Sequence, residues 1–188
     1  VPVLDLYEDA TSGVRLEEIR SMGPASFAKP STETLNFSRH GSAYWVRFRL
    51  SSPGPAVWLV KCDNPQIDRI DLFLVTKGGV LRKTAGDEFP FGSREFQHRN
   101  FIFPLGLPAG ESEVFIRFKS QGSLFFQLHL MTPSAFARAD YLEQWGLGLY
   151  YGVIIVMILF NFLIYMAVRD PAYLYYVFYI LTFGLFKF

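Results

Sequence analysis

Aromatic and cationic side chains recur together in three short segments of the chain, each of which alternates apolar residues with others. Successive side chains of a β-strand point to opposite faces, so residues two apart share a face. An aromatic ring can stack on the C–H face of a sugar while neighbouring polar groups pair with its hydroxyls. If the three strands lie in one sheet, they predict a face that binds a carbohydrate or another small molecule, made of Trp45, Arg47, Arg49, Phe115, Arg117, Phe125, Gln127 and His129.

A sheet face of this composition also occurs without any ligand. Its aromatic rings then cover their neighbours, and the arginine stems lie across them. Arg94 is a further candidate, because a guanidinium offers a planar fork of donors to a diol or a carboxylate. For both Arg94 and Arg47, however, a structural ion pair with Asp71 or Asp87 is an equally good interpretation.

The residues that metal binding or catalysis would need are not gathered in the sequence. His40, His98 and His129 lie on separate segments without ligand spacing, and the single cysteine, Cys62, has no partner for an internal disulfide. Nothing marks a nucleophile elbow or a positioned base. We therefore expect no metal, no cofactor and no enzyme activity in this part of the protein. Residues 1–144 carry 16 basic and 16 acidic side chains, a balance that leaves no electrostatic footprint for nucleic acid.

The elements that must position these side chains are seven short apolar-alternating segments. Turn residues such as Ser52-Pro53-Gly54-Pro55 and Lys77-Gly78-Gly79 separate them. Strands at this spacing predict a mainly β fold over residues 1–132, a β-sandwich of the jelly-roll type. A short helix is expected over residues 16–20. The predicted strands cover residues 43–51, 56–62, 67–75, 80–85, 100–107, 112–120 and 124–131.

A different kind of element begins where charged residues disappear. Residues 145–168 form a run of 24 without Asp, Glu, Lys, Arg or His. A helix of this length reaches roughly 36 Å, enough for a hydrocarbon core of about 30 Å. Its apolar residues lie on every side instead of in one stripe, which is typical of a transmembrane helix. Residues 133–144 are predicted to be a connecting helix that leads directly into this span.

A second apolar stretch follows a break in the chain at Arg169-Asp170-Pro171. Proline disfavours helical geometry in the residue before it and suits the first turn of a new helix. We interpret residues 173–188 as a second transmembrane helix that is truncated. In the first span, Gly148 and Gly152 form a small-xxx-small pattern that permits close helix approach. Asn161 is expected to face a partner helix, because an unpaired amide is costly in lipid.

A series of short motifs runs through nearly the whole chain. They are Leu6-Tyr7-Glu8-Asp9, Leu16-Glu17-Glu18, Tyr44-Trp45-Val46-Arg47-Phe48, Asn64-Pro65-Gln66-Ile67-Asp68-Arg69-Ile70-Asp71-Leu72-Phe73, Gly86-Asp87, Phe89-Pro90, Ser93-Arg94, Arg99-Asn100-Phe101-Ile102-Phe103-Pro104-Leu105, Gly148-Leu149-Tyr150-Tyr151-Gly152, Phe160-Asn161 and Arg169-Asp170-Pro171-Ala172-Tyr173-Leu174-Tyr175-Tyr176. In this order they resemble the bacterial seven-transmembrane receptors with diverse intracellular signalling modules, and in particular their extracellular domain of type 2.

This resemblance implies a periplasmic jelly-roll domain similar to carbohydrate-binding modules. It implies seven helices that couple the domain to a cytoplasmic output, such as a histidine kinase or a diguanylate cyclase. It also places residues 1–144 in the periplasm and the membrane part in a bacterial inner membrane.

Residue patterns and resemblance together predict a ligand-sensing domain and the start of a membrane bundle in a signal-transduction receptor. The expected partners are a glycan or another small molecule and the lipid bilayer. The alternative is a module for protein–protein contact without a small ligand, whose exposed sheet forms a homodimer or meets a partner receptor. A membrane-tethered jelly-roll hydrolase is a third interpretation.

Overall fold

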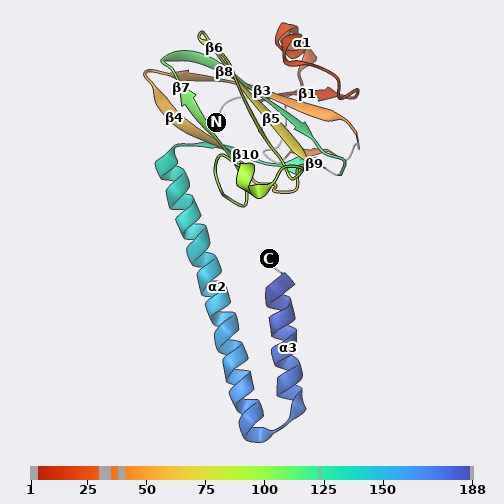
Figure 1. Cartoon of the computed structure of the whole chain (residues 1–188), viewed down its shortest axis with the longest axis vertical. Coiled ribbons are helices and arrows are strands. Elements are labelled where there is room, and N and C mark those ends of the chain that lie inside the picture. Colours follow the sequence, from red (N-terminus) through yellow and green to blue (C-terminus); the bar gives the residue numbers. More distant parts are fainter. Residues whose placement is uncertain (1–3, 30–34, 38–40, 123, 187–188) are drawn as a thin grey trace. The chain divides into compact units, whose positions relative to one another are not determined.

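The computed structural model describes residues 4–29, 35–37, 41–122 and 124–186. His40 and the last two residues of the predicted second membrane helix lie outside the described residues. The chain divides into two compact units, Val1–Pro133 and Ser134–Phe188. Strands build the first unit and two helices build the second (Figure 1).

The first unit contains ten strands and one α-helix among its described residues. The helix, α1, spans Leu16–Ser21, and short 3-10 turns lie at Pro24–Ser26 and Phe91–Ser93. The strands are β1 (Asp5–Asp9), β2 (Leu35–Phe37), β3 (Ala43–Ser52), β4 (Ala56–Cys62), β5 (Arg69–Thr76), β6 (Gly79–Ala85), β7 (Phe101–Leu107), β8 (Gly110–Lys119), β9 (Leu124–Phe126) and β10 (Leu128–Met131).

The strands form antiparallel sheets that enclose one main core. Five strands pair in the order β1-β3-β8-β5-β6, three in the order β10-β4-β7, and β2 pairs with β9. Val46, Leu72 and Ile116 point inward from the five-stranded sheet and pack in one buried cluster with Val60 and Phe103 of the three-stranded sheet. Burying each such side chain stabilises the fold by about 1.5–3 kcal/mol. The predicted mainly β sandwich, followed by a long apolar helix, is confirmed.

The seven predicted strands agree with the structure to within two residues at each end, but the last of them is divided and two further strands are present. Residues 124–131 do not form one strand, because the chain leaves strand geometry at Gln127, and β9 and β10 pair in different sheets. Strands β1 and β2 were not predicted. The sequence of β1, Asp-Leu-Tyr-Glu-Asp, is short and has three carboxylates, so its apolar alternation is weak, as is tolerated at the edge of a sheet.

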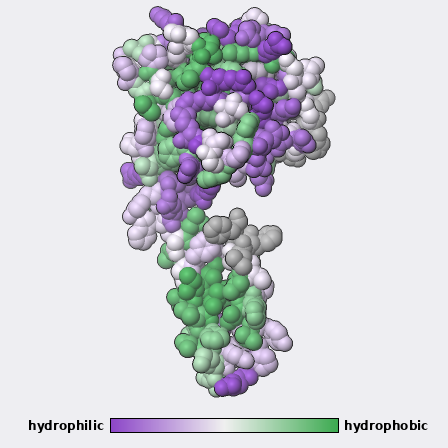
Figure 2. All heavy atoms as spheres, in the orientation of Figure 1, coloured by the Kyte–Doolittle hydropathy of each residue, from purple (hydrophilic) through white to green (hydrophobic). Residues whose placement is uncertain are grey.

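The second unit consists of α2 (Pro133–Val168) and α3 (Pro171–Phe186). In α2 the most apolar window has a mean hydropathy of 2.4, and among the described residues it is the one helix long and apolar enough to cross a membrane. Its surface is hydrophobic along most of its length, whereas the surface of the β unit is mixed (Figure 2). The boundary within α2 between the connecting helix and the membrane span stays a prediction.

The predicted break between the helices is confirmed, and local hydrogen bonds explain it. Arg169 has a φ of 63° and donates its backbone N–H to the carbonyl of Tyr165, which closes α2. The Asp170 carboxylate accepts the backbone N–H of Ala172 at 2.9 Å, and Pro171 is the first residue of α3.

Each of the two helices has a stripe of less exposed residues spaced three and four apart, and the two helices come close to each other at Gly184. A Cβ placed on Gly184 of α3 would lie 3.4 Å from Cδ1 of Ile154 on α2, an ordinary van der Waals distance, so the two helices are close to each other there. Asn161 donates its side-chain amide to the carbonyl of Met157 in its own helix at 2.8 Å. The stripes comprise Ile154, Ile158, Asn161 and Tyr165 on α2, and Tyr173, Val177, Ile180 and Gly184 on α3.

Candidate ligand-binding site

The outer face of the five-stranded sheet carries the polar and aromatic side chains that the strand pattern singled out. The pairing register places Trp45 opposite Arg117 and Arg47 opposite Phe115. This confirms that these four residues share one face. The register also extends the two rows across the sheet, the first as Tyr7, Trp45, Arg117, Asp71 and Thr84, and the second as Asp5, Arg47, Phe115, Phe73 and Arg82.

Helix α1 covers part of this outer face. Leu16 and Ile19 are three residues apart, so they lie on one side of α1, and both are buried against Trp45 and Phe115. Trp45 and Phe115 are each 1% exposed. The predicted stacking platform is therefore closed at these two rings, because residues upstream of the first predicted strand fold back over them.

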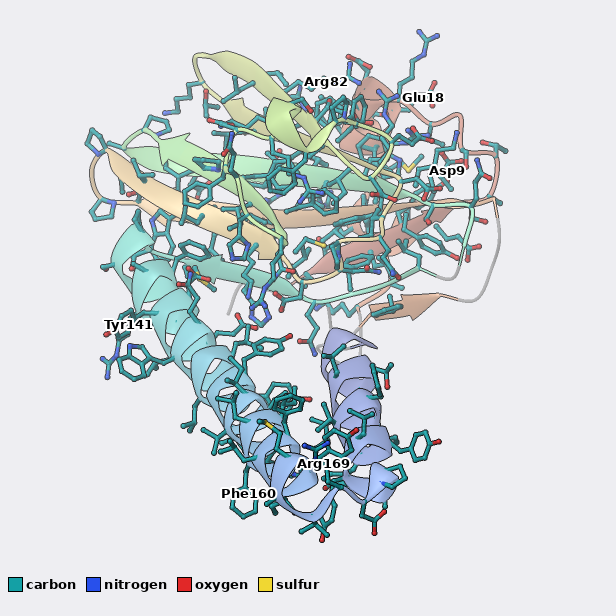
Figure 3. All side chains as sticks on the ribbon, turned by 60° about the horizontal axis from the view of Figure 1, so that its bottom comes forward. Asp9, Glu18, Arg82, Tyr141, Phe160 and Arg169 are labelled. Carbon is teal, nitrogen blue, oxygen red and sulfur yellow. The ribbon has the colours of Figure 1, made fainter. Side chains whose placement is uncertain are left out.

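Hydrogen bonds fix the loop that brings α1 to the sheet. The carboxylate of Asp9, labelled in Figure 3, accepts the backbone N–H of Thr11 at 3.1 Å, its hydroxyl at 2.7 Å and the backbone N–H of Val14 at 2.9 Å. The carbonyl of Ser12 accepts a hydrogen bond from Nη2 of Arg117 at 2.7 Å. The backbone N–H of Arg15 then bonds the Glu18 carboxylate at the start of the helix.

The arginines singled out from the sequence have structural partners in this conformation. Arg47 is bonded to Asp5 at 2.8 Å, and its guanidinium lies 3.9 Å from the centre of the Phe27 ring. Its ion pair was expected with Asp71 or Asp87, but β1 supplies the carboxylate instead. Arg49 pairs with Glu113 at 3.0 Å on the exposed surface.

Arg94 shapes its own loop and pairs with neither expected aspartate. Its Nη1 donates to the carbonyls of His98 at 2.8 Å and Arg99 at 3.1 Å. Its guanidinium also lies over the rings of Phe91 and Phe101. Arg94 therefore stands apart from the outer face of the five-stranded sheet.

The remaining predicted residues lie outside that sheet. Phe125 is on β9, Gln127 follows it, and His129 is on β10, so the assumption of a single sheet fails for these three. Nε2 of His129 lies 2.7 Å from the carboxylate of Asp63, which also pairs with Lys61 at 2.8 Å. Among the described residues, no group of three or more His, Cys, Asp or Glu could hold a metal ion.

Beside α1, the outer face stays open and forms a pocket of about 490 Å³. We call it the arginine pocket. Its floor includes Trp45, Asp71, Phe73 and Arg117, and its rim includes Arg82 of β6, while the segment from residue 13 to residue 20 supplies the other wall. Arg82 and α1, where Glu18 is labelled, lie beside each other at this end of the domain (Figure 3). The volume falls within the range of small-molecule sites, about 300–1,000 Å³.

Asp71 is the electrostatic centre of the pocket floor. Its carboxylate accepts hydrogen bonds from Arg69 at 3.0 Å, Arg82 at 3.0 Å and Thr84 at 2.8 Å, and its side chain is 4% exposed. Burial by itself raises the pKa of Asp71, but the hydrogen bonds from Arg69, Thr84 and Arg82 outweigh it and hold the pKa below its ordinary value of 3.8. Asp71 is therefore ionised at neutral pH.

The pocket floor holds more hydrogen-bond donors than acceptors. Nη1 of Arg117 lies 3.9 Å from the Asp71 carboxylate, beyond hydrogen-bond distance. Nε of Arg117 and Nε1 of Trp45 are buried and have no hydrogen-bond partner within the described part of the chain. Because buried donors are usually paired, two neighbouring unpaired ones are unusual.

Beside these charges, Trp45 and Phe73 form the aromatic side of the floor, which we call the aromatic wall. The rings of Trp45 and Phe73 are stacked with their centres 5.8 Å apart, and the Arg82 guanidinium lies 5.5 Å from the centre of Phe73. Phe73 and Arg82 were not among the predicted site residues. The signal was available for Phe73, since residues 69–75 alternate as strictly as the three segments that were used.

The described structure is thus a β-sandwich with a polar pocket, followed by an apolar helix long enough to cross a membrane. The chain belongs to the 7TMR-DISM family: residues 2–132 match the family described as 7TMR-DISM extracellular 2, and residues 143–188 match 7TM diverse intracellular signalling. The resemblance seen in the sequence is confirmed. The chain comprises the extracellular sensory domain and transmembrane region of such a membrane receptor, and neither of these parts is an enzyme.

Other comparisons add little. No curated protein matches the chain. Among solved structures, a β-glucosidase from Kluyveromyces marxianus in complex with glucose is similar over 69% of this chain, with 11% sequence identity and a TM-score of 0.43. The similar part spans 15% of the length of the β-glucosidase. A likeness this distant bears on neither function nor ligand.

Proposed function

We propose that the β-sandwich is the ligand-sensing part of the receptor and that it binds a small molecule in the arginine pocket. The observation that carries the proposal is a pocket of about 490 Å³ in the extracellular sensory domain, lined by charged groups and by an aromatic wall. Two residues of the predicted face, Trp45 and Arg117, line this pocket. The ligand is a small molecule, for which a carbohydrate was the expectation from the sequence.

The experiment that tests this proposal blocks the pocket without disturbing the core. Val80 lines the pocket on β6 and is 49% exposed, so a tryptophan there fills the opening. Leu81 is equally exposed on the same strand but does not line the pocket, which makes Leu81→Trp the matched control.

The chain is reconstituted in nanodiscs of phosphatidylcholine and tested against a panel of glycans and metabolites. At least one compound should raise the Tm and give a calorimetric binding signal in the wild type and in Leu81→Trp, but not in Val80→Trp. If no compound does so and the protein dimerises at micromolar concentration, the sensing proposal fails. The alternative, a module for homodimerisation or contact with a partner receptor, then takes its place.

We also propose that residues 1–144 face the periplasm of a bacterial inner membrane, with Arg169 on the cytoplasmic side. The extracellular character of the matched domain supports this orientation. Alkaline phosphatase, which is active only outside the cytoplasm, should be active when fused before α2 and inactive when fused at Asp170. Equal activity of both fusions would contradict the orientation.

A further inference from the structure

The lining of the arginine pocket has an excess of positive charge. Four arginines line it, Arg15, Arg20, Arg82 and Arg117, against the two carboxylates of Glu17 and Asp71. Arg69 brings a further guanidinium to the same carboxylate of Asp71. Like charges gathered in a concave site raise the local potential and concentrate an anion there.

The single buried carboxylate cannot satisfy the guanidinium groups around it. Asp71 Oδ1 already accepts bonds from Arg82 and Thr84, and Oδ2 accepts one from Arg69. Arg117 is left with one hydrogen bond, from Nη2 to the carbonyl of Ser12, and its Nη1 lies 3.9 Å from the Asp71 carboxylate, beyond hydrogen-bond distance. The floor is therefore short of acceptor oxygens, which a ligand carboxylate supplies in pairs.

The apolar part of the lining adds a second requirement. Phe73 is half-buried, stacked on Trp45 and flanked by the exposed Val80. A bare inorganic anion would make no apolar contact with this aromatic wall. A ring or a flat apolar body joined to the anionic group covers it.

We infer that the arginine pocket binds a small organic acid, whose carboxylate is held by Arg82 and Arg117 and whose ring or apolar body lies against Phe73. This inference rests on the proposed function, since it names the ligand class of the same pocket. It narrows the carbohydrate or other small molecule expected from the sequence to an acid, and the acid can be aromatic or a sugar acid.

The test uses matched pairs of probes on the full chain in phosphatidylcholine nanodiscs. The pairs are phenylacetate with phenylacetamide and glucuronate with glucose, and inorganic phosphate is the anion without a body. At least one acid should bind ten times or more tightly than its neutral counterpart and more tightly than phosphate. Its affinity should fall as the salt concentration is raised, and the pair that responds tells an aromatic acid from a sugar acid.

Two arginine variants locate the anion. Arg82 is 54% exposed, so Arg82→Gln removes a charge without opening the core, and it should weaken the acid at least about tenfold. Arg49 is an exposed arginine on the same sheet, paired with Glu113 and outside the pocket, so Arg49→Gln should leave the affinity unchanged.

The outcomes separate this inference from the proposed function. If neutral probes bind as well as acids, and Val80→Trp abolishes that binding, the acid is excluded as the ligand class while the sensing pocket stands. Preference for phosphate over both acids, or an unchanged affinity in Arg82→Gln, also overturns the inference. If no probe binds in a way that Val80→Trp removes, both fail.

Discussion

Replacing Asp71 by asparagine tests the charge arrangement of the pocket floor. The substitution keeps the shape of the side chain but removes the charge that Arg69 and Arg82 contact at 3.0 Å. A hydrogen bond to a buried charged group contributes about 1.5–3 kcal/mol. The side chains of Arg69 and Arg82 are 37% and 54% exposed, so solvent screening reduces their share. We expect a loss of about 2–4 kcal/mol, below the 3–5 kcal/mol typical of a broken fully buried pair.

For a domain of this size, such a loss lowers the Tm by roughly 6–20 °C at neutral pH, which thermal unfolding followed by circular dichroism can measure. The pH dependence has a definite sign. The pKa of Asp71 is lower in the folded state than in the unfolded chain, so its stabilisation is present above about pH 4 and is lost as the pH falls through the folded-state pKa. The Tm difference between wild type and Asp71→Asn should therefore shrink in acid.

Glu113→Gln is the control for Asp71→Asn. It breaks the exposed pair with Arg49, whose side chain is 70% exposed, and should cost less than about 1 kcal/mol. A Tm for Asp71→Asn within 2 °C of the wild type at pH 7, on the order of the control effect, would refute the reasoning. So would a difference that is the same at pH 3 as at pH 7.

Three further substitutions or treatments probe the fold. Gly86→Ala should destabilise the domain by more than about 2 kcal/mol, because Gly86 has a φ of 156° and its new Cβ would lie 2.0 Å from a backbone oxygen; Gly92→Ala, with open space around it, should leave the Tm nearly unchanged. Ile19→Ala should cost about 2–4 kcal/mol and shift the emission of Trp45 to the red, as α1 loosens from the sheet; an unshifted spectrum would contradict this. Burial raises the pKa of the Cys62 thiol to about 12, so iodoacetamide should label it at pH 8 only after unfolding, as mass spectrometry can show.

Which residues of one strand share the face that carries the pocket could be predicted from the sequence, because this depends on the local periodicity of that strand. Trp45 belongs to the outward-facing residues of β3, and Arg117 belongs to those of β8. The antiparallel register then places the two residues opposite each other. The partner of Arg47 could not be predicted in this way. Asp5 comes from β1, whose charged sequence gives a weak strand signal, and the pair forms only when β1 joins the edge of the sheet.

The break at Gln127 shows a different limit of periodicity. Apolar residues occupy every second position from Leu124 to Leu130 without interruption, because in both halves these side chains pack against the main core. A period of two reports which face is buried but not which sheet a strand joins. Phe125 and His129 were therefore assigned to a surface that they do not share with Trp45.

The covering of Trp45 by α1 depends on tertiary packing, so the periodicity of a single strand does not report it. A helix of six residues is too short to be stable alone, so α1 persists because Leu16 and Ile19 are buried on the sheet. The sheet side of the pocket is held by the main core, whereas the α1 side is held by this small contact. A ligand that contacts both the sheet and α1 stabilises the conformation in which α1 lies on the sheet. We therefore expect a ligand bound as inferred above to stabilise α1 more than the sheet side of the pocket.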